Sequence, residues 1–248
     1  MKIDYPTTED LPALRRLWQN TFGDSDAYLD VFFSIAYAPQ RCLCLRTNAQ
    51  IVAAAYWLDC EIGGKKAAYI YAVATDEGHR GRGYCHALMA QIHSLLLSQD
   101  YCICLLVPAD ARLRHMYRGM GYADFGGVQE FTCQAASPAE ALRPVEQQEF
   151  AALRRKYLPE NALIQEGCTL ELLSRLADFH AGDDCLLTVS REGNRILEFL
   201  GNTEKLPGIL FSLHMQSASV RIPGNMPFAM YHSLKEAKTP TYFSFALD

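Results

Sequence analysis

The chain has 248 residues, half of them hydrophobic and about a fifth charged, and its formal net charge is −5. This length suits one large domain or two small ones, and this composition is typical of a globular protein. The acidic balance argues against nucleic acid as a general partner. The longest apolar run, residues 51–58, is too short to cross a membrane, so we expect no membrane partner.

The nine cysteines do not form a disulfide pattern. Cys42 and Cys44 alternate along one predicted strand, and Cys102 and Cys104 along another, so each pair shares a face and is expected to be buried. The odd count and the absence of Cys-x-x-Cys argue for reduced thiols. Charges near the first residue leave no apolar core for a signal peptide. We expect a cytoplasmic protein.

Two helices open the chain. The first is predicted to start after Thr7 or Thr8 and to end near Gly23, and the second to start at Asp24 or Ser25. The elements expected next are strands at 41–47, 51–60 and 67–75, a glycine turn and a helix, a strand at 101–107, a helix at about 110–119, and a β-prone segment ending near residue 133. A mixed order with a strand–helix–strand unit predicts an α/β or α+β sheet.

The second half repeats this order loosely after a linker at 135–140. Its expected elements are helices at 145–157 and 169–179, strands at 185–190 and 195–200, a helix at about 203–215, and strands at 219–222 and 241–247. We therefore expect two domains, 1–134 and 135–248. The turn at 201–204 lacks the basic residue and the second glycine of its counterpart at 80–83, so we expect no phosphate there.

The turn Arg80-Gly81-Arg82-Gly83 stands between a predicted strand and a predicted helix. At such a junction the free N–H groups of the first helical turn and the helix dipole favour an anion, and glycine lets it approach the backbone. The alternative is that the glycines only make the turn. The local basic spot on an acidic chain favours a phosphate-bearing ligand.

Two common phosphate loops do not fit this turn. A Walker loop needs Lys-Ser/Thr where Tyr84 and Cys85 follow Gly83, and a dinucleotide fingerprint needs glycine at His86. The stretch instead resembles the acyl-CoA signature of the GNAT superfamily of N-acyltransferases, Arg/Gln-x-x-Gly-x-Gly/Ala. Arg80, Gly83 and Cys85 occupy its three fixed positions, with Cys85 in place of the usual glycine or alanine.

Two further motifs carry the resemblance, which covers about residues 2–134. Val73-Ala74-Thr75 matches the family's Val-x-Val segment. The later motif from Asp110 through Tyr117 to Tyr122 resembles Asn-x6-Tyr-x3-Gly-Phe, with aspartate and tyrosine replacing asparagine and phenylalanine. The family fold is a mixed, mostly antiparallel central sheet flanked by helices. The second, smaller α/β half is then expected to be a degenerate copy.

The resemblance implies acetyl-CoA as co-substrate, with the pantetheine arm along the strand and the pyrophosphate on the turn amides. The residues expected to bind it are Val73, Ala74, Thr75, Arg80, Gly81, Arg82, Gly83, Tyr84, Cys85 and Asp110. No metal is expected, because His86 and His93 share a helix face without a third ligand.

The expected reaction is attack of an amine on the thioester carbonyl, which requires oxyanion stabilisation and a proton for the departing thiolate. In the family a backbone N–H near Val73 stabilises the oxyanion. Tyr117 matches the family's general acid, although a core tyrosine is the alternative. The glutamate that some members place on the strand is missing. Tyr69 and Tyr71, expected on the same face as Val73, are candidates to hold a relaying water, with packing as the alternative; Tyr71 is the catalytic candidate.

The acceptor pocket of the family lies partly at the junction of the first two helices. Here that junction carries Trp18, Phe22, Asp24, Asp26 and Tyr28. Aromatic walls with two carboxylates suit a cationic amine, although helix capping explains the aspartates better. The expected function is N-acetyl transfer from acetyl-CoA to a primary amine of a small molecule or peptide, by a monomer or homodimer. The alternatives are a non-catalytic acyl-CoA sensor or scaffold, and an interaction module with a vestigial turn.

Overall fold

A computed structural model describes residues 1–246, which form two compact units. The first unit contains residues 1–123 and 230–237, and the second contains residues 124–229 and those from 238 onward. The chain therefore enters each unit twice. The boundary expected at residue 134 falls inside the second unit, and each unit is described separately below.

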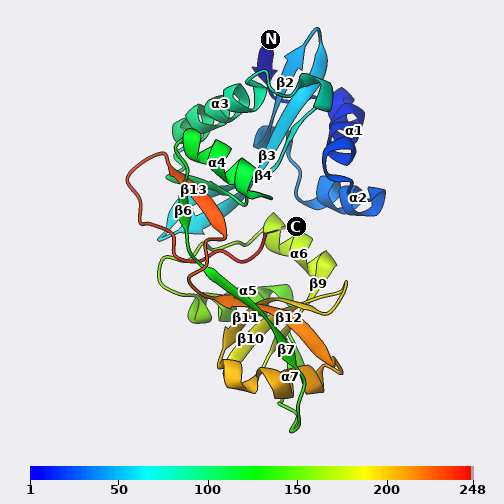
Figure 1. Ribbon diagram of the computed structural model, residues 1–248, viewed down its shortest axis with the longest axis vertical. Helices are drawn as coiled ribbons and strands as arrows, with labels where there is room; N and C mark the ends of the chain where they lie inside the picture. Colours follow the sequence, from blue (N-terminus) through cyan, green and yellow to red (C-terminus); the bar gives the residue numbers. More distant parts are fainter. Residues whose placement is uncertain (247–248) are drawn as a thin grey trace. The chain divides into compact units, whose positions relative to one another are not determined.

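The first unit is built on a seven-stranded sheet (Figure 1). Its strands, in spatial order, are β1 (Lys2–Asp4), β2 (Cys42–Thr47), β3 (Gln50–Ile62), β4 (Lys65–Thr75), β5 (Ile103–Leu106), β13 (Ala229–Ser233) and β6 (Ala123–Phe125). Strands β1 to β4 are mutually antiparallel, β4 and β5 are parallel, and β13 is antiparallel to β5. The mixed, mostly antiparallel sheet expected from the sequence is confirmed.

Two helices cover each face of this sheet (Figure 1). They are α1 (Leu11–Phe22) and α2 (Asp26–Ile35) on one face and α3 (Tyr84–Ser98) and α4 (Ala111–Gly119) on the other. Helix α1 follows a capping box between Thr7 and Asp10 and ends at Gly23, whose φ of +77° breaks the helix. Ser25 caps α2 by accepting a hydrogen bond from the Tyr28 N–H.

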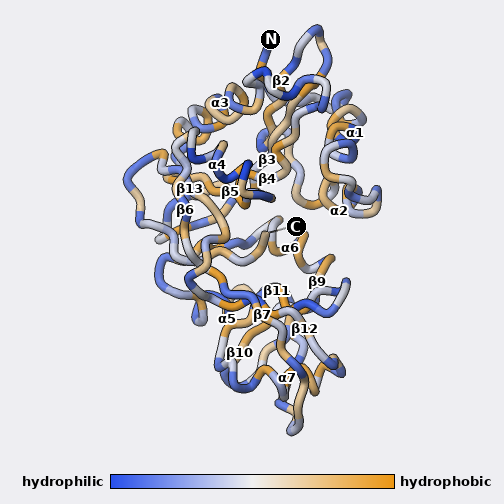
Figure 2. The backbone as a smooth tube through the Cα atoms, in the orientation of Figure 1, coloured by the Kyte–Doolittle hydropathy of each residue, from blue (hydrophilic) through white to orange (hydrophobic). Residues whose placement is uncertain are grey.

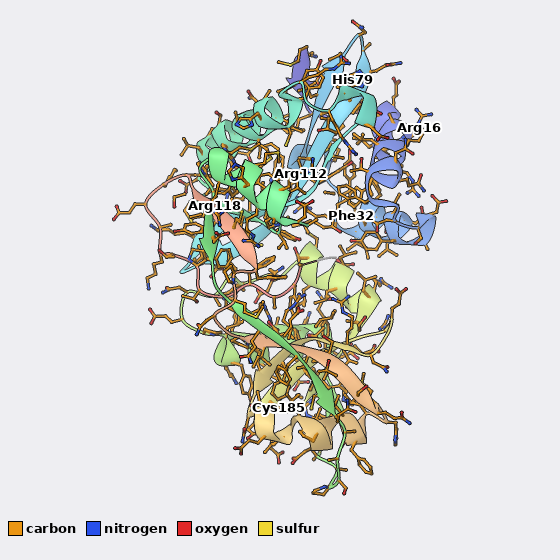
Figure 3. All side chains as sticks on the ribbon, in the orientation of Figure 1. Arg16, Phe32, His79, Arg112, Arg118 and Cys185 are labelled. Atoms are coloured by element: carbon orange, nitrogen blue, oxygen red, sulfur yellow. The ribbon has the colours of Figure 1, made fainter. Side chains whose placement is uncertain are left out.

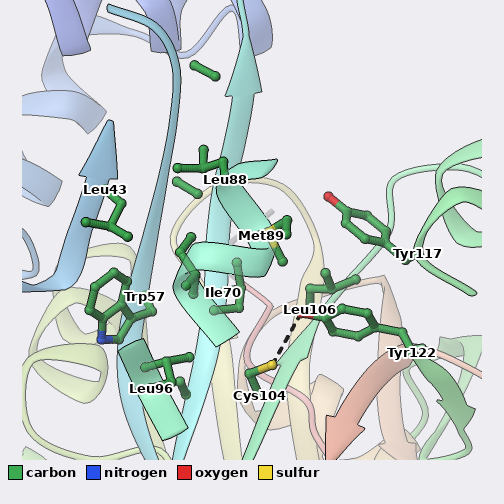
Figure 4. Packing of buried hydrophobic residues seen from close by; sticks show 14 of the residues in the cluster. Leu43, Trp57, Ile70, Leu88, Met89, Leu96, Cys104, Leu106, Tyr117 and Tyr122 are labelled. Atoms are coloured by element: carbon green, nitrogen blue, oxygen red, sulfur yellow. Dashed lines mark hydrogen bonds between the residues drawn. The ribbon is translucent and has the colours of Figure 1, made fainter. Parts of the chain in front are cut away.

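The core between the sheet and α3 contains Leu88, Met89 and Ile92 of the helix, packed over Trp57 and Ile70 (Figure 4). Hydrophobic residues run along the strands of this sheet in Figure 2. All nine cysteines are free, and the two pairs of alternating strand cysteines are buried, as their spacing predicted. Burying such side chains is the main favourable term in the stability of this unit.

The second unit has a six-stranded sheet. In spatial order its strands are β7 (Val128–Gln134), β12 (Ser217–Pro223), β11 (Arg195–Gly201), β10 (Cys185–Ser190), β9 (Ala177–Ala181) and β8 (Arg143–Pro144). Its helices are α5 (Gln147–Tyr157), α6 (Cys168–Leu176) and α7 (Leu206–Ser212). Strands β11 and β12 are parallel, and the other pairings are antiparallel.

The two units share one element order. A short edge strand, two helices, three antiparallel strands, a helix and a parallel strand occur as β1-α1-α2-β2-β3-β4-α3-β5 and again as β8-α5-α6-β9-β10-β11-α7-β12. The next strand outward is exchanged: β7, which follows the first unit in the chain, pairs with β12, and β13, which follows β12, pairs with β5. This repeated order agrees with the expectation that the second half is a degenerate copy of the fold of the first.

The structure differs from the predicted elements at several places. The helix expected at 169–179 ends at Leu176, and residues 177–181 form β9. Strand β13 was not predicted, because it is short and its partner β5 is remote in sequence. The strand expected at 241–247 does not form within the described residues 241–246, where Tyr242 makes only an isolated bridge to Ala162; residue 247 lies outside them.

Candidate active site

Strands β4 and β5 separate partway along their length. Their parallel pairing joins Ala67–Tyr69 to Ile103–Leu105, and in the described chain residues 70–75 of β4 make no pair with β5. Backbone groups on this side of β4 that β5 does not use can hydrogen-bond to water or to a ligand. This split contains the predicted segment Val73, Ala74 and Thr75.

A bulge at Ala72 changes which way β4 side chains point. Ala72 has a φ of +48°, and the register with β3 shifts opposite this residue. Val73 packs against the cluster under α3, whereas Tyr71 packs against Trp18 of α1 on the other face. The prediction that Tyr71 shares a face with Val73 was therefore wrong, because simple alternation fails across a bulge.

The glycine turn ends in an open helix N-terminus. Gly81 and Gly83 have φ of +73° and +77°, and a Cβ added to either would meet no atom within 4 Å. Gly83 is the N-cap residue of α3, and no side chain caps the N–H groups of the first turn at this position. The first turn of α3 also contains no acidic residue. The glycines are thus required by backbone conformation, and the amides at the start of α3 are available to an anion.

The charged side chains of this turn are held by backbone carbonyls. Arg80 Nε donates to the Thr75 carbonyl (3.2 Å), and Arg82 Nη2 donates to the Gly78 carbonyl (3.0 Å). His79 Nδ1 lies 2.6 Å from Asp76 Oδ2. Both guanidiniums are exposed and have further N–H groups, so they can add positive charge to the site.

Tyr84 and Cys85 begin α3 and are partly buried against the core cluster. The Tyr84 ring stacks on His79 with centroids 6.3 Å apart. Burial raises the pKa of the Cys85 thiol to about 11, so it is protonated at neutral pH. Cys85 therefore behaves as the small packing residue that its motif position requires, and a thiolate nucleophile is disfavoured.

Tyr117 of α4 is only 6 % exposed and packs on the same cluster as Val73 and Cys85. Burial, with a smaller contribution from Cys85, raises its pKa well above the usual range, so the phenol keeps its proton. Within residues 1–246 its hydroxyl makes no hydrogen bond. Figure 4 shows it beside Tyr122, whose hydroxyl bonds Cys104 (3.3 Å). A protonated phenol without a hydrogen-bond partner suits a general acid.

Asp110 has a structural role that its motif match did not reveal. Its Oδ1 accepts a hydrogen bond from the Leu113 N–H (2.6 Å), which makes Asp110 the N-cap of α4. Arg112 and Arg118 lie on this helix (Figure 3). The cap uses only Oδ1, so the second carboxylate oxygen, Oδ2, is not needed for it.

Tyr71 lies in an aromatic cluster beneath α1 and α2. Its hydroxyl is 2.7 Å from the Tyr28 hydroxyl, its ring centroid is 5.5 Å from that of Trp18, and burial raises its pKa well above the usual range. Trp18 Nε1 donates to Asp24 Oδ2 (2.7 Å). Ser25, not Asp24, caps α2, so Asp24 instead fixes the indole. The Tyr28–Tyr71 pair was missed because it joins residues of a helix and a remote strand.

A groove of about 390 Å³ opens beside the turn, between α1 and the β2–β3 turn. Arg16 is exposed in its wall, and His79 marks the nearby end of β4 (Figure 3). Other charged groups of the wall are paired with each other: Arg46 with Asp10 (2.7 Å), and His79 with Asp76.

The described residues contain no group of three His, Cys, Asp or Glu side chains arranged to hold a metal ion. No helix among residues 1–246 is long and apolar enough to cross a membrane. The candidate site therefore consists of the β4–β5 split, the glycine turn, Tyr117 on one face of the sheet and Tyr71 on the other.

Comparison with known proteins identifies this arrangement. Residues 2–124 match the family model of the acetyltransferase (GNAT) domain. The first half of the chain therefore belongs to the GNAT superfamily, as its motifs indicated. The search of curated proteins gave no match.

Solved structures extend the likeness of fold to both halves. A GCN5-related N-acetyltransferase from Kribbella flavida superposes with a TM-score of 0.71 at 17% identity, over 93% of this chain and 70% of that one. One from Anabaena variabilis gives 0.72 at 17% identity, over 94% and 72%. A putative acetyltransferase from Pyrococcus horikoshii gives 0.68 at 12% identity, over 98% and 91%. At these identities the likeness concerns the fold alone.

Proposed function

We propose that the protein transfers an acetyl group from acetyl-CoA to a primary amine of a small molecule or peptide. The observation that carries this proposal is the split between β4 and β5, which leads directly into the uncapped N-terminus of α3. An extended ligand with a pyrophosphate at one end matches that geometry: an unpaired strand edge followed by anion-binding amides.

In this proposal residues 73–75 of β4 offer backbone hydrogen bonds to the pantetheine arm. The amides of residues 81–85 bind the pyrophosphate, and Arg80 and Arg82 add charge. The open space next to Gly81 and Gly83 fits a group that approaches the backbone closely. Asp110, the N-cap residue of α4, is proposed to contribute to acetyl-CoA binding through its position at the start of that helix.

The chemical step forms a C–N bond and breaks the thioester C–S bond. The amine lone pair attacks the carbonyl carbon, and a backbone N–H near Val73 stabilises the oxyanion. Tyr117 then donates its proton to the departing CoA thiolate, and the proton released by the amine restores the phenol by way of solvent. The raised pKa of Tyr117 keeps that proton available at neutral pH.

The acceptor amine is proposed to enter beside Tyr71 and Tyr28. An ammonium must lose a proton before it attacks, and two phenols 2.7 Å apart form a path for that proton toward water. The surrounding rings, among them Trp18 at 5.5 Å, and the carboxylate of Asp24 would favour a cation. Tyr71 is thus a positioning and relay residue in this proposal.

A non-catalytic acyl-CoA sensor is the second candidate function. It is favoured by the missing carboxylate on β4: some family members have a glutamate early in this strand, and here the candidate positions are Ala67, Tyr69 and Tyr71. Calorimetric titration with acetyl-CoA, followed by release of CoA thiol with a panel of amines, separates the two. Binding near one per chain with turnover supports the enzyme, and binding without turnover on any amine supports the sensor.

We further propose that the chain works in a reducing cytoplasm as a monomer or homodimer. Nine free cysteines, most of them buried, suit a reducing compartment. Light scattering of the purified chain measures the oligomeric state, and a mass above that of a dimer would refute this proposal.

A further inference from the structure

The second unit contains its own split between parallel strands. Strands β11 and β12 pair at Arg195–Ser219 and Ile196–Val220, and in the described chain residues 197–201 of β11 make no pair with β12. The element order places this split where β4 and β5 separate in the first unit. Glu198 and Arg221 stand just beyond the last paired residues of the two strands.

The chain's own C-terminal segment fills the space around this split. Tyr242, Phe243, Ser244 and Phe245 are each at most 1 % exposed. The Ser244 carbonyl accepts a hydrogen bond from Arg221 Nη1 on β12 (2.7 Å), and its hydroxyl donates to Glu198 on β11. One residue of the segment thus contacts both separating strands.

The connection between α5 and α6 holds the same segment by its backbone. The Leu163 N–H donates to the Tyr242 carbonyl (2.9 Å), and Gln165 Nε2 donates to the Phe245 carbonyl (2.8 Å). The backbone carbonyls of Tyr242, Ser244 and Phe245 thus each accept a hydrogen bond from outside the segment, although the segment belongs to no strand. Such a pattern of backbone contacts is how proteins bind peptide ligands.

A buried ion pair contacts the C-terminal segment through Ser244. Arg154 of α5 binds Glu198 through two hydrogen bonds of 2.7 and 2.9 Å, and both side chains are at most 2 % exposed. The Arg154 guanidinium also lies 4.2 Å from the Phe245 ring centroid. Buried charges are stable only when their remaining hydrogen-bonding groups have partners, and Ser244 supplies one of them.

The first unit has different residues at the matching places. Counted from Leu11 and Gln147, Trp18 and Arg154 are each the eighth residue of their helix, and Tyr71 and Glu198 each lie two residues beyond the last pairing with the parallel strand. The first unit therefore has an indole and a phenol where the second has an ion pair.

We propose that the split of the second unit is a binding site for a peptide segment, and that its ligand in this chain is the C-terminal segment, residues 239–246. Its recognition elements are the Ser244 carbonyl and hydroxyl, followed by the aromatic ring of Phe245. The segment occupies the site fully, so the second unit takes no acyl-CoA.

The test is to cut the connection and ask whether the peptide stays. A protease site inserted between the exposed residues Lys238 and Thr239 allows cleavage of the folded chain. Native mass spectrometry should find the released peptide still bound, and a labelled synthetic peptide of residues 239–248 should exchange with it at one per chain. The S244A peptide should bind about tenfold more weakly, because it lacks the bond to Glu198. A T239A peptide is the control and should bind like the parent.

A second measurement uses the uncut protein. Hydrogen exchange at the Leu163 amide should be slow in the parent chain and faster in Ser244→Ala. Loss of the cut peptide without any change in the thermal unfolding midpoint would overturn the proposal. Two acetyl-CoA bound per intact chain would also overturn it. Neither result depends on whether the first unit is catalytic.

Discussion

The sharpest test of the proposed co-substrate site is Gly83→Asp. Gly83 has a φ of +77° and open space where a Cβ would lie, so the substitution places a carboxylate at the helix N-terminus without a steric clash. A non-glycine residue in this conformation costs roughly 1–2 kcal/mol. A carboxylate about 4 Å from a phosphate charge adds repulsion on the order of 4 kcal/mol near a protein surface. The electrostatic part alone predicts at least roughly a hundredfold loss of acetyl-CoA affinity.

Gly64→Asp is the matched control. Gly64 has a φ of +76° and equally open space, but it lies in the turn between β3 and β4, before the strand rather than after it. Both variants carry the same backbone strain and charge, so calorimetric titration with acetyl-CoA isolates the effect of position. Equal affinities for the two variants would refute the assignment of the glycine turn as the pyrophosphate site.

Three further outcomes are expected. Tyr117→Phe should lower kcat by roughly 10²–10⁴-fold with little change in acetyl-CoA affinity, measured by thiol release and calorimetry; full turnover would remove Tyr117 as the acid. Tyr71→Phe should lower turnover. It also removes the 2.7 Å hydrogen bond to the Tyr28 hydroxyl, so the free energy of unfolding measured by urea titration should decrease by about 1 kcal/mol. Unchanged turnover would show that Tyr71 is only a packing residue. Burial, and then His232, lowers the pKa of His93 to about 4, so the folded state binds fewer protons than the unfolded state between pH 4 and 6.5. The free energy of unfolding should therefore decrease as the pH is lowered across that range, by up to about 3 kcal/mol from this group. Urea titrations at several pH values should find a smaller decrease in His93→Gln and an unchanged decrease in the exposed-site control His86→Gln.

The parts of the site that depend on nearby residues were predictable from the sequence. The glycine turn needs only residues 80–85 and the pattern on either side. The caps of α1 and α2 depend on Thr7, Gly23 and Ser25, all within a few residues of the helix ends. Local signals of this kind fix turns and helix ends in most folds.

Features made by distant contacts were not predictable in this way. The bulge at Ala72 depends on pairing with β3, and it reversed the face expected for Val73. The β-prone residues near Phe245 suggested a strand, yet their carbonyls bind the side chains of Arg221 and Gln165 instead of a neighbouring strand. Propensity records how well residues suit a half-buried surface, and it does not identify the partner.

Because β7 and β13 are exchanged between the two sheets, the first sheet can be completed only late in synthesis. The sheet of the first unit has β13 between β5 and β6, so it stays incomplete until residues 229–233 have left the ribosome. Until then the edge of β5 has unpaired N–H and C=O groups, which invite pairing with other chains. The nascent first half is therefore the stage at which we expect this protein to need a chaperone. For the same reason, expression of residues 1–134 alone should yield aggregated protein.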